Sequence, residues 1–133
     1  MFLTLARALD TGVFGVGPSA NAALESFTVH ARVLLEFFFG ANPRAEDVVA
    51  DDFLESQGKW AGLRGDLPPA LKDLRDRVGT EVAHLTYARL AVTPSTKPWP
   101  FVEIVNAFEG VIGAFLRAVP ESRLGPPAPI LAL

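Results

Sequence analysis

Apolar residues recur at steps of three and four positions in four stretches of the chain, and glycine or proline punctuates the segments between them. This spacing places the apolar side chains on one side of an α-helix. The first stretch is short, covers about residues 2–9 and is followed by Gly12, where a C-terminal cap would stand. The third covers residues 67–90, with two prolines in its first turn, and the fourth covers about residues 101–119.

The second stretch, about residues 21–39, is the most apolar of the four. We expect Ser19 and Asn21 to cap its start and Gly40 to end it. Helical spacing gathers polar residues on one side, namely Glu25, Thr28, Arg32 and Glu36. It gathers a second set on the opposite, apolar side, namely Phe27, His30, Leu34, Phe37 and Phe38. A histidine there is either a core residue satisfied by hydrogen bonds or, given a partner from another helix, a functional group.

The connections between these stretches carry weaker signals. Residues 46–54 predict a short extra helix with its valines facing inward, and Trp60 falls in a glycine-rich loop. Asp51 and Asp52 are adjacent and therefore face different sides of a helix, which suits a solvated or capping role better than a metal site. The three prolines of residues 92–100 predict an extended loop.

Long helices without a strand pattern or an internal repeat predict an all-α fold, an up-and-down four-helix-type bundle with a short extra helix. A chain of 133 residues is large enough for one core and too short for two. We therefore expect one domain over residues 1–133, with its core at about residues 20–119 and peripheral arms at residues 1–18 and 120–133.

Composition narrows the classes of function. The chain has no cysteine, which excludes disulfides, thiolate metal sites and a cysteine nucleophile. Its net charge of -3 gives no bulk attraction to nucleic acid or to an anionic membrane, so a phosphate-binding surface has to be a local patch. The N-terminus does not resemble a signal peptide, and no apolar run approaches the roughly 20 residues of a spanning helix. We expect a cytoplasmic protein without membrane contact.

Charged and titratable groups gather in the third stretch, on a segment whose apolar residues otherwise favour a buried helix. Arg77, Glu81 and His84 follow one another at steps of four and three, so an α-helix places them in one strip beside its apolar side. Arginine binds phosphate through its planar fork, and histidine exchanges a proton near neutral pH. The strip predicts a phosphate site or, alternatively, a surface network in which Glu81 pairs with Arg77.

The sequence Arg77-Val-Gly-Thr-Glu-Val-Ala-His84 resembles the Arg-x(4–6)-His motif of the HEPN superfamily, which lies on the penultimate long helix of a small all-α bundle. Residues 27–38, 48–53 and 83–89 also look like segments of a bacterial family of such bundles. The likeness covers about residues 20–119, which is nearly the whole chain.

This resemblance implies a homodimer in which two copies of the motif meet across a two-fold interface and form a metal-independent endoribonuclease site of toxin or defence type. His84 would then move protons, Arg77 would orient the scissile phosphate, and Glu81 would complete the catalytic set. The candidate substrate-binding residues in the matching segments are His30, Arg32 and Arg89. No cofactor and no metal are expected.

Two other classes of function stay open. Val78 stands where active members often carry a polar residue, and the chain is net acidic, which favours a non-catalytic helical module for dimerisation or for a cognate protein partner. A metal-binding bundle ranks third. Glu81-Val-Ala-His84 is half of a di-iron motif, and a symmetric dimer would have to supply the other half.

Overall fold

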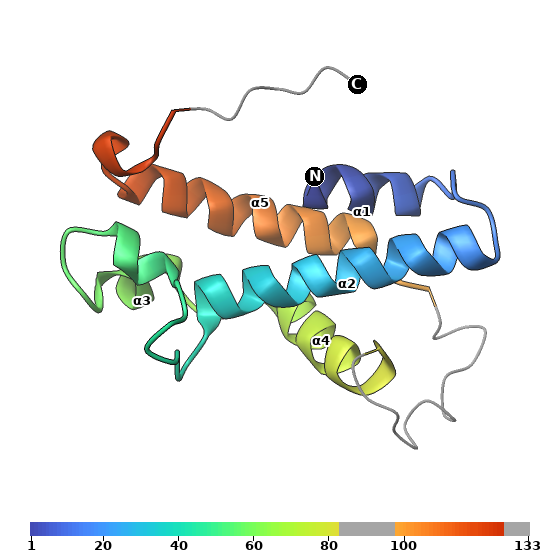
Figure 1. Ribbon diagram of the computed structural model, residues 1–133, viewed down its shortest axis with the longest axis horizontal. Coiled ribbons are helices and arrows are strands. Elements are labelled where there is room, and N and C mark those ends of the chain that lie inside the picture. The colour runs from blue at the N-terminus through green and yellow to red at the C-terminus, as the bar shows by residue number, and fades with distance from the viewer. Residues whose placement is uncertain (83–97, 127–133) are drawn as a thin grey trace.

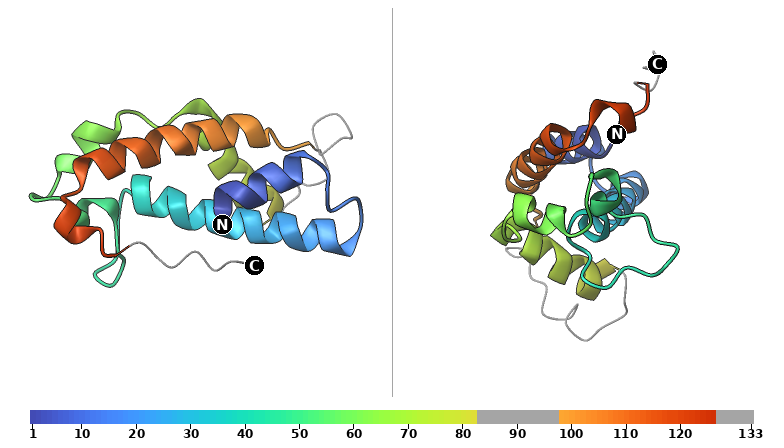
Figure 2. Two further views of the ribbon diagram at one scale, coloured as in Figure 1. Left: turned by 90° about the horizontal axis from the view of Figure 1, so that it is seen from above. Right: turned by 90° about the vertical axis from the view of Figure 1, so that its left-hand side faces the viewer.

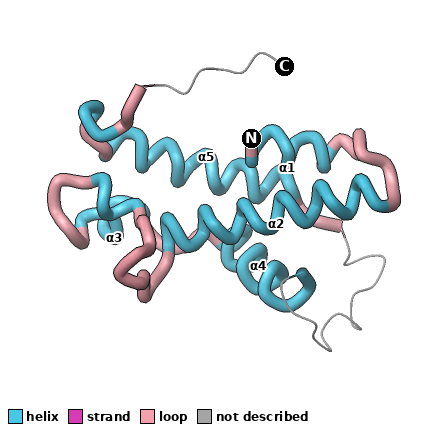
Figure 3. The backbone as a smooth tube through the Cα atoms, viewed as in Figure 1, coloured by secondary structure: helices cyan, strands magenta, loops and turns pink. Residues whose placement is uncertain are grey.

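The computed structural model describes residues 1–82 and 98–126, which form helices and connecting loops with no strand among them (Figures 1 and 3). The all-α class predicted from the sequence is therefore confirmed for these residues. In chain order the helices are α1 (Phe2–Asp10), α2 (Pro18–Phe39), the 3₁₀ turn η1 (Ala50–Phe53), α3 (Lys59–Arg64), α4 (Pro69–Arg77), the π-helix η2 (Val78–Val82), α5 (Phe101–Ala118) and the 3₁₀ turn η4 (Glu121–Arg123). None of the described helices is long and apolar enough to cross a membrane.

The long helices α2 and α5 form the frame on which the shorter helices pack (Figures 1 and 2). Helix α1 contacts both of them, α4 contacts α5 and α2, and α3 contacts α5. The core lies between these helices, and its largest side chains without solvent exposure are Phe27 and Phe108. Burial of such rings supplies the main stabilising term of the fold.

Two groups of aromatic rings fill the space between α2 and α5. The first surrounds Phe27, whose ring contacts Phe2, Phe101 and Trp99. The second surrounds Phe115 and consists of Phe37, Phe38, Phe53, Trp60 and Phe115. Most of these pairs meet edge to face, a geometry that adds about 0.5–1.5 kcal/mol per pair to the burial of apolar area. The high phenylalanine content is therefore used within this single chain.

The glycines predicted to end the first two helices do so, whereas the residues predicted to cap the start of α2 do not. Gly12 follows α1 with a φ of 70°, which glycine adopts without strain. Gly40 ends α2, and a Cβ there would lie 2.6 Å from the carbonyl oxygen of Glu36. The expected caps at Ser19 and Asn21 are wrong, because α2 begins at Pro18, whose ring fixes the φ angle of the first turn.

Several predictions of burial are wrong. Thr28 is 1% exposed although it was placed on the polar side of α2. Its hydroxyl donates to the carbonyl oxygen of Glu25 at 2.8 Å, so the side chain enters the core with its polar group satisfied. Val48, expected to face inward, is 63% exposed, and Leu116, an apolar residue of the fourth predicted stretch, is 51% exposed.

The segment around Trp60 is more ordered than its glycine-rich sequence predicts. Trp60 belongs to α3, is buried and donates from Nε1 to the carbonyl oxygen of Phe38 at 2.8 Å. The carboxylate of Asp51 accepts the backbone N–H groups of Gly58 and Trp60, and that of Asp52 accepts the N–H of Val49 at 2.9 Å. The capping role predicted for the two aspartates is confirmed, while the short helix predicted at residues 46–54 is only the turn η1.

The third predicted helix changes character within the part that the structure describes. It begins at Pro69, two residues after the predicted start at residue 67, and it buries Leu71, Leu74 and Val78 on the predicted apolar side. The α-helix ends at Arg77, and a π-helix follows over Val78–Val82. The continuation to residue 90 and most of the loop at 92–100 lie outside the described residues.

Gly110 lies in the interior of α5, and no atom of the described residues is within 4 Å of the position that a Cβ would occupy. Glycines in a helix allow close approach of another helix, but no described helix uses Gly110 or Gly113 in this way, since Gly113 has only the Arg117 side chain nearby. We expect Gly110→Ala to raise the free energy of unfolding by about 0.5–1 kcal/mol, because alanine restricts the unfolded chain and favours the helix. Chemical denaturation measures it, and a lower stability would contradict the open space seen at this position.

Candidate functional site

The structure places only part of the predicted catalytic strip. Arg77 is the last residue of α4 and is partly buried. His84 and Arg89 lie outside the described residues, and so does the side chain of Glu81. The expectation that Arg77, Glu81 and His84 share one strip therefore stays a prediction.

The guanidinium of Arg77 joins the end of α4 to the residues that precede α5. It donates from Nη1 to the carbonyl oxygen of Pro98 at 3.0 Å and lies 4.0 Å from the centroid of the Trp99 ring. Trp99 in turn meets the edge of the Phe27 ring, with the two centroids 6.3 Å apart. A cation held over a tryptophan face gains about 0.5–2 kcal/mol. Arg77 therefore has a structural role, whatever its role toward a ligand.

The π-helix Val78–Val82 begins directly after Arg77, inside the predicted motif. In a π-helix the backbone N–H bonds five residues back rather than four, so each turn accommodates one more residue. The register of residues 79–82 consequently differs from that of the unbroken α-helix assumed from the sequence. Short π-helical segments are rare and occur frequently at functional sites, which draws attention to this part of the chain.

Two arginines from different helices line one shallow pocket next to this π-helix. Arg32 comes from α2 and Arg75 from α4, and the pocket has a volume of about 160 Å³. Its other lining residues are Leu35, Glu36, Val78 and Gly79. Arg32 was predicted as a substrate-binding residue, whereas Arg75 was not. Arg75, Val78 and Gly79 follow one another at helical spacing, but that spacing does not reveal that α4 crosses α2 at this point.

The charges of this pocket favour an anion. Arg32, Arg75 and Glu36 are all exposed, and the two guanidinium groups and one carboxylate leave one net positive charge. Within residues 1–82 and 98–126, neither arginine forms an ion pair, since the salt bridges there are Arg7–Glu109 and Lys72–Asp76. Both guanidinium groups keep N–H donors for a ligand. Because they are exposed, their attraction to an anion will weaken as salt concentration rises.

An apolar groove adjoins the pocket and shares Arg32 and Glu36 with it. The groove has a volume of about 640 Å³ and lies between the second half of α2 and residues 40–49. Its apolar lining includes Leu34, Phe37 and Val49. The basic pocket and the groove together form a surface with charge at one end and apolar side chains at the other.

His30 is partly buried on α2 and does not line the basic pocket. Among the described residues there is no group of three or more histidine, aspartate or glutamate side chains that could hold a metal ion. The metal-binding alternative thus gains no support from the part of the chain that the structure places.

The basic pocket, the adjoining groove and the Arg77 contact are the features on which a functional interpretation can rest. No protein-family model, curated protein or solved structure matches this chain, so its function has to follow from the chemistry of these side chains.

Proposed function

We propose that this protein cleaves RNA without a metal ion, as the resemblance to the HEPN superfamily implies, and that it binds the RNA in single-stranded form. The observation that carries the proposal is the convergence of Arg32 and Arg75 on one pocket, next to the helix end that bears Arg77. This local patch answers the objection raised by the net charge of -3, because phosphate contacts need only a positive surface where the RNA lies.

The adjoining surfaces suit the two parts of a nucleotide. The guanidinium groups of Arg32 and Arg75 match phosphate oxygens in geometry and charge. The groove beside them offers the ring of Phe37 and aliphatic side chains to unstacked bases. Bases of single-stranded RNA are free to use such a surface, whereas those of a duplex are stacked inside it.

The proposal includes three features expected from the sequence, namely an up-and-down bundle, a homodimer and a cytoplasmic location. The homodimer would bring two copies of the Arg77/His84 motif together. Support for an assembly surface comes from α2, where Val29 and Val33 are each 60% exposed. Adjacent exposed apolar residues on one side of a helix offer a surface for contact with another protein.

The same exposed valines favour a second candidate function, a non-catalytic dimerisation or interaction module. The two candidates are distinguished by measuring RNA binding and the state of association on the same sample. A chain that associates at micromolar concentration and binds no RNA supports the module, while a monomer without RNA binding contradicts both.

Replacing both pocket arginines, Arg32→Gln/Arg75→Gln, is expected to weaken binding of single-stranded RNA at least about tenfold, because two charge-assisted contacts are lost. The slope of log affinity against log salt should fall by about 1.4, since each phosphate contact on a single strand contributes about 0.7. Fluorescence anisotropy of a labelled oligoribonucleotide, repeated over a series of salt concentrations, measures both quantities.

The matched control is Lys59→Gln/Arg117→Gln, which removes the same charge from exposed residues that do not line the pocket. This control should change the affinity much less. An equal loss in the two variants would show that total charge, rather than the Arg32/Arg75 pocket, governs binding.

A further inference from the structure

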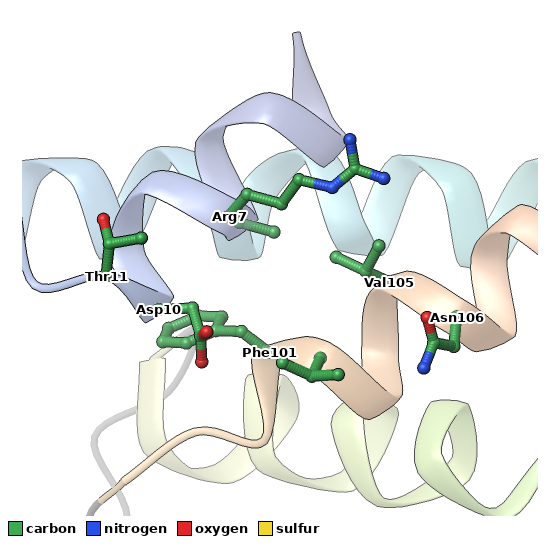
Figure 4. A pocket seen from close by; sticks show the side chains of 8 residues that line it. Arg7, Asp10, Thr11, Phe101, Val105 and Asn106 are labelled. Atoms are coloured by element: carbon green, nitrogen blue, oxygen red, sulfur yellow. The ribbon is translucent and has the colours of Figure 1, made fainter.

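A separate pocket of about 270 Å³ lies between the last turn of α1 and the first turns of α5 (Figure 4). Ala6 and Val105 provide a buried apolar floor, at 0% and 5% exposure, and the ring of Phe101 adds an aromatic wall. None of its lining residues belongs to the basic pocket or to the apolar groove. This site is therefore independent of the proposed RNA contacts.

The rim of the pocket carries one carboxylate whose charge is not compensated. Arg7 lines the pocket, but its guanidinium forms an ion pair with Glu109. In Figure 4 the side chain of Arg7 extends away from Asp10. Within the part of the chain that the structure places, Asp10 forms no ion pair. With Arg7 neutralised by Glu109, Asp10 leaves the pocket with one net negative charge.

The position of Asp10 at the end of α1 also favours a positively charged ligand. It is the last residue of α1, where the backbone carbonyl groups point toward the helix end and disfavour a negative side chain. Helix α5 begins on the other side of the pocket and presents the opposite end of its dipole, but Glu103 lies in that first turn and offsets it. A bound cation would satisfy both the Asp10 carboxylate and the end of α1.

We propose that this pocket binds an organic cation, an ammonium or guanidinium group on an apolar stem. The carboxylate of Asp10 would accept a charge-assisted hydrogen bond from the cation, the Phe101 ring would attract its positive charge, and the floor would receive the stem. Such a group is either a free small amine or the lysine or arginine side chain of another protein.

The test titrates the ¹⁵N-labelled full chain with butylamine and with n-butylguanidine, following backbone amide shifts at residues 6–11 and 101–106. Saturable shifts are expected with both cations, and none with n-butanol or pentanoate, which carry the same butyl stem without the positive charge. A parallel titration uses a short arginine peptide and its norleucine counterpart. Tighter binding of the arginine peptide than of n-butylguanidine identifies a protein side chain as the ligand, and the reverse identifies a free amine.

Asp10→Asn keeps the shape of the side chain and removes its charge, so it should weaken binding of both cations about tenfold. Asp73→Asn, an exposed aspartate on α4, is the matched control and should leave the affinity unchanged. Phe101→Leu retains an apolar wall and should also weaken binding, with circular dichroism confirming its fold. Equal shifts with n-butanol, or unchanged affinity for the cations in Asp10→Asn, would overturn the proposal. Whether or not Asp10→Asn weakens cation binding, it should leave RNA binding unaffected.

Discussion

Replacing Phe27 by alanine is expected to lower the free energy of unfolding by about 3–5 kcal/mol. Phe27 has no solvent exposure, and its ring stacks on Phe2 with centroids 5.0 Å apart and an interplanar angle of 12°. It also meets the ring of Phe101 at 5.2 Å, which joins α2 to α5. Alanine would leave a cavity among three helices and remove both contacts. Urea denaturation followed by circular dichroism measures the loss.

Such a loss is large beside the roughly 5–15 kcal/mol that stabilises a domain of ordinary size. Two variants test the reason for it. Phe27→Leu keeps most of the volume and should lose about 1.5 kcal/mol or less, whereas Val13→Ala, at a position 70% exposed after α1, should stay within about 0.5 kcal/mol of the parent. A Phe27→Ala variant no less stable than Val13→Ala would show that the rings around Phe27 do not form the core described above.

Features with a local cause were predictable from the sequence. The helices at residues 2–9 and 101–119 agree with α1 and α5 within one residue, because apolar periodicity and flanking glycine or proline act over a few positions. Leu71 and Leu74 face the core as their spacing predicts. The capping role of Asp51 also has a local cause, since its partners Gly58 and Trp60 follow within nine residues.

Features that depend on contacts between distant segments were not predictable. Trp60 of α3 is buried, and its indole N–H donates a hydrogen bond to the carbonyl oxygen of Phe38, which lies 22 residues earlier in the chain. Leu116 falls on the apolar pattern of α5 but is 51% exposed, since no other described helix covers that side at this point. The period of a helix identifies its apolar side, while only the arrangement of its neighbours decides how wide the buried part is.

The same distinction applies to the candidate site. Arg32 was identified from a matching segment, but its neighbour Arg75 was missed because their proximity arises where α4 crosses α2. The contact of Arg77 with Trp99 joins residues 22 positions apart, across a proline-rich segment that gives no spacing to analyse. The π-helix after Arg77 was also missed, since a standard period of 3.6 residues was assumed throughout.

Replacing His84 by alanine is expected to lower the rate of RNA cleavage by about 10²–10⁴-fold while leaving RNA affinity nearly unchanged. In metal-independent cleavage the 2′-hydroxyl of the RNA attacks the adjacent phosphorus, and the 5′-oxygen of the next nucleotide leaves. The attacking hydroxyl loses a proton and the leaving oxygen gains one, and histidine accepts and donates protons near neutral pH. Gel analysis of end-labelled single-stranded and structured RNA in EDTA gives the rate, and anisotropy at early times gives the affinity.

His30→Ala is the matched control for His84→Ala, because the chain has only two histidines and this variant makes the same substitution on α2. As a candidate substrate-binding residue, His30 should affect affinity more than the rate of the chemical step.

Arg77→Lys separates the two roles of Arg77, since lysine keeps the charge but loses the planar fork that orients phosphate and stacks on Trp99. If Arg77→Lys lowers the rate of cleavage under conditions in which the variant stays folded, Arg77 contacts the phosphate. Cleavage that survives unchanged in His84→Ala, or that disappears in EDTA, would contradict the proposed mechanism while leaving RNA binding by Arg32 and Arg75 to be judged on its own test.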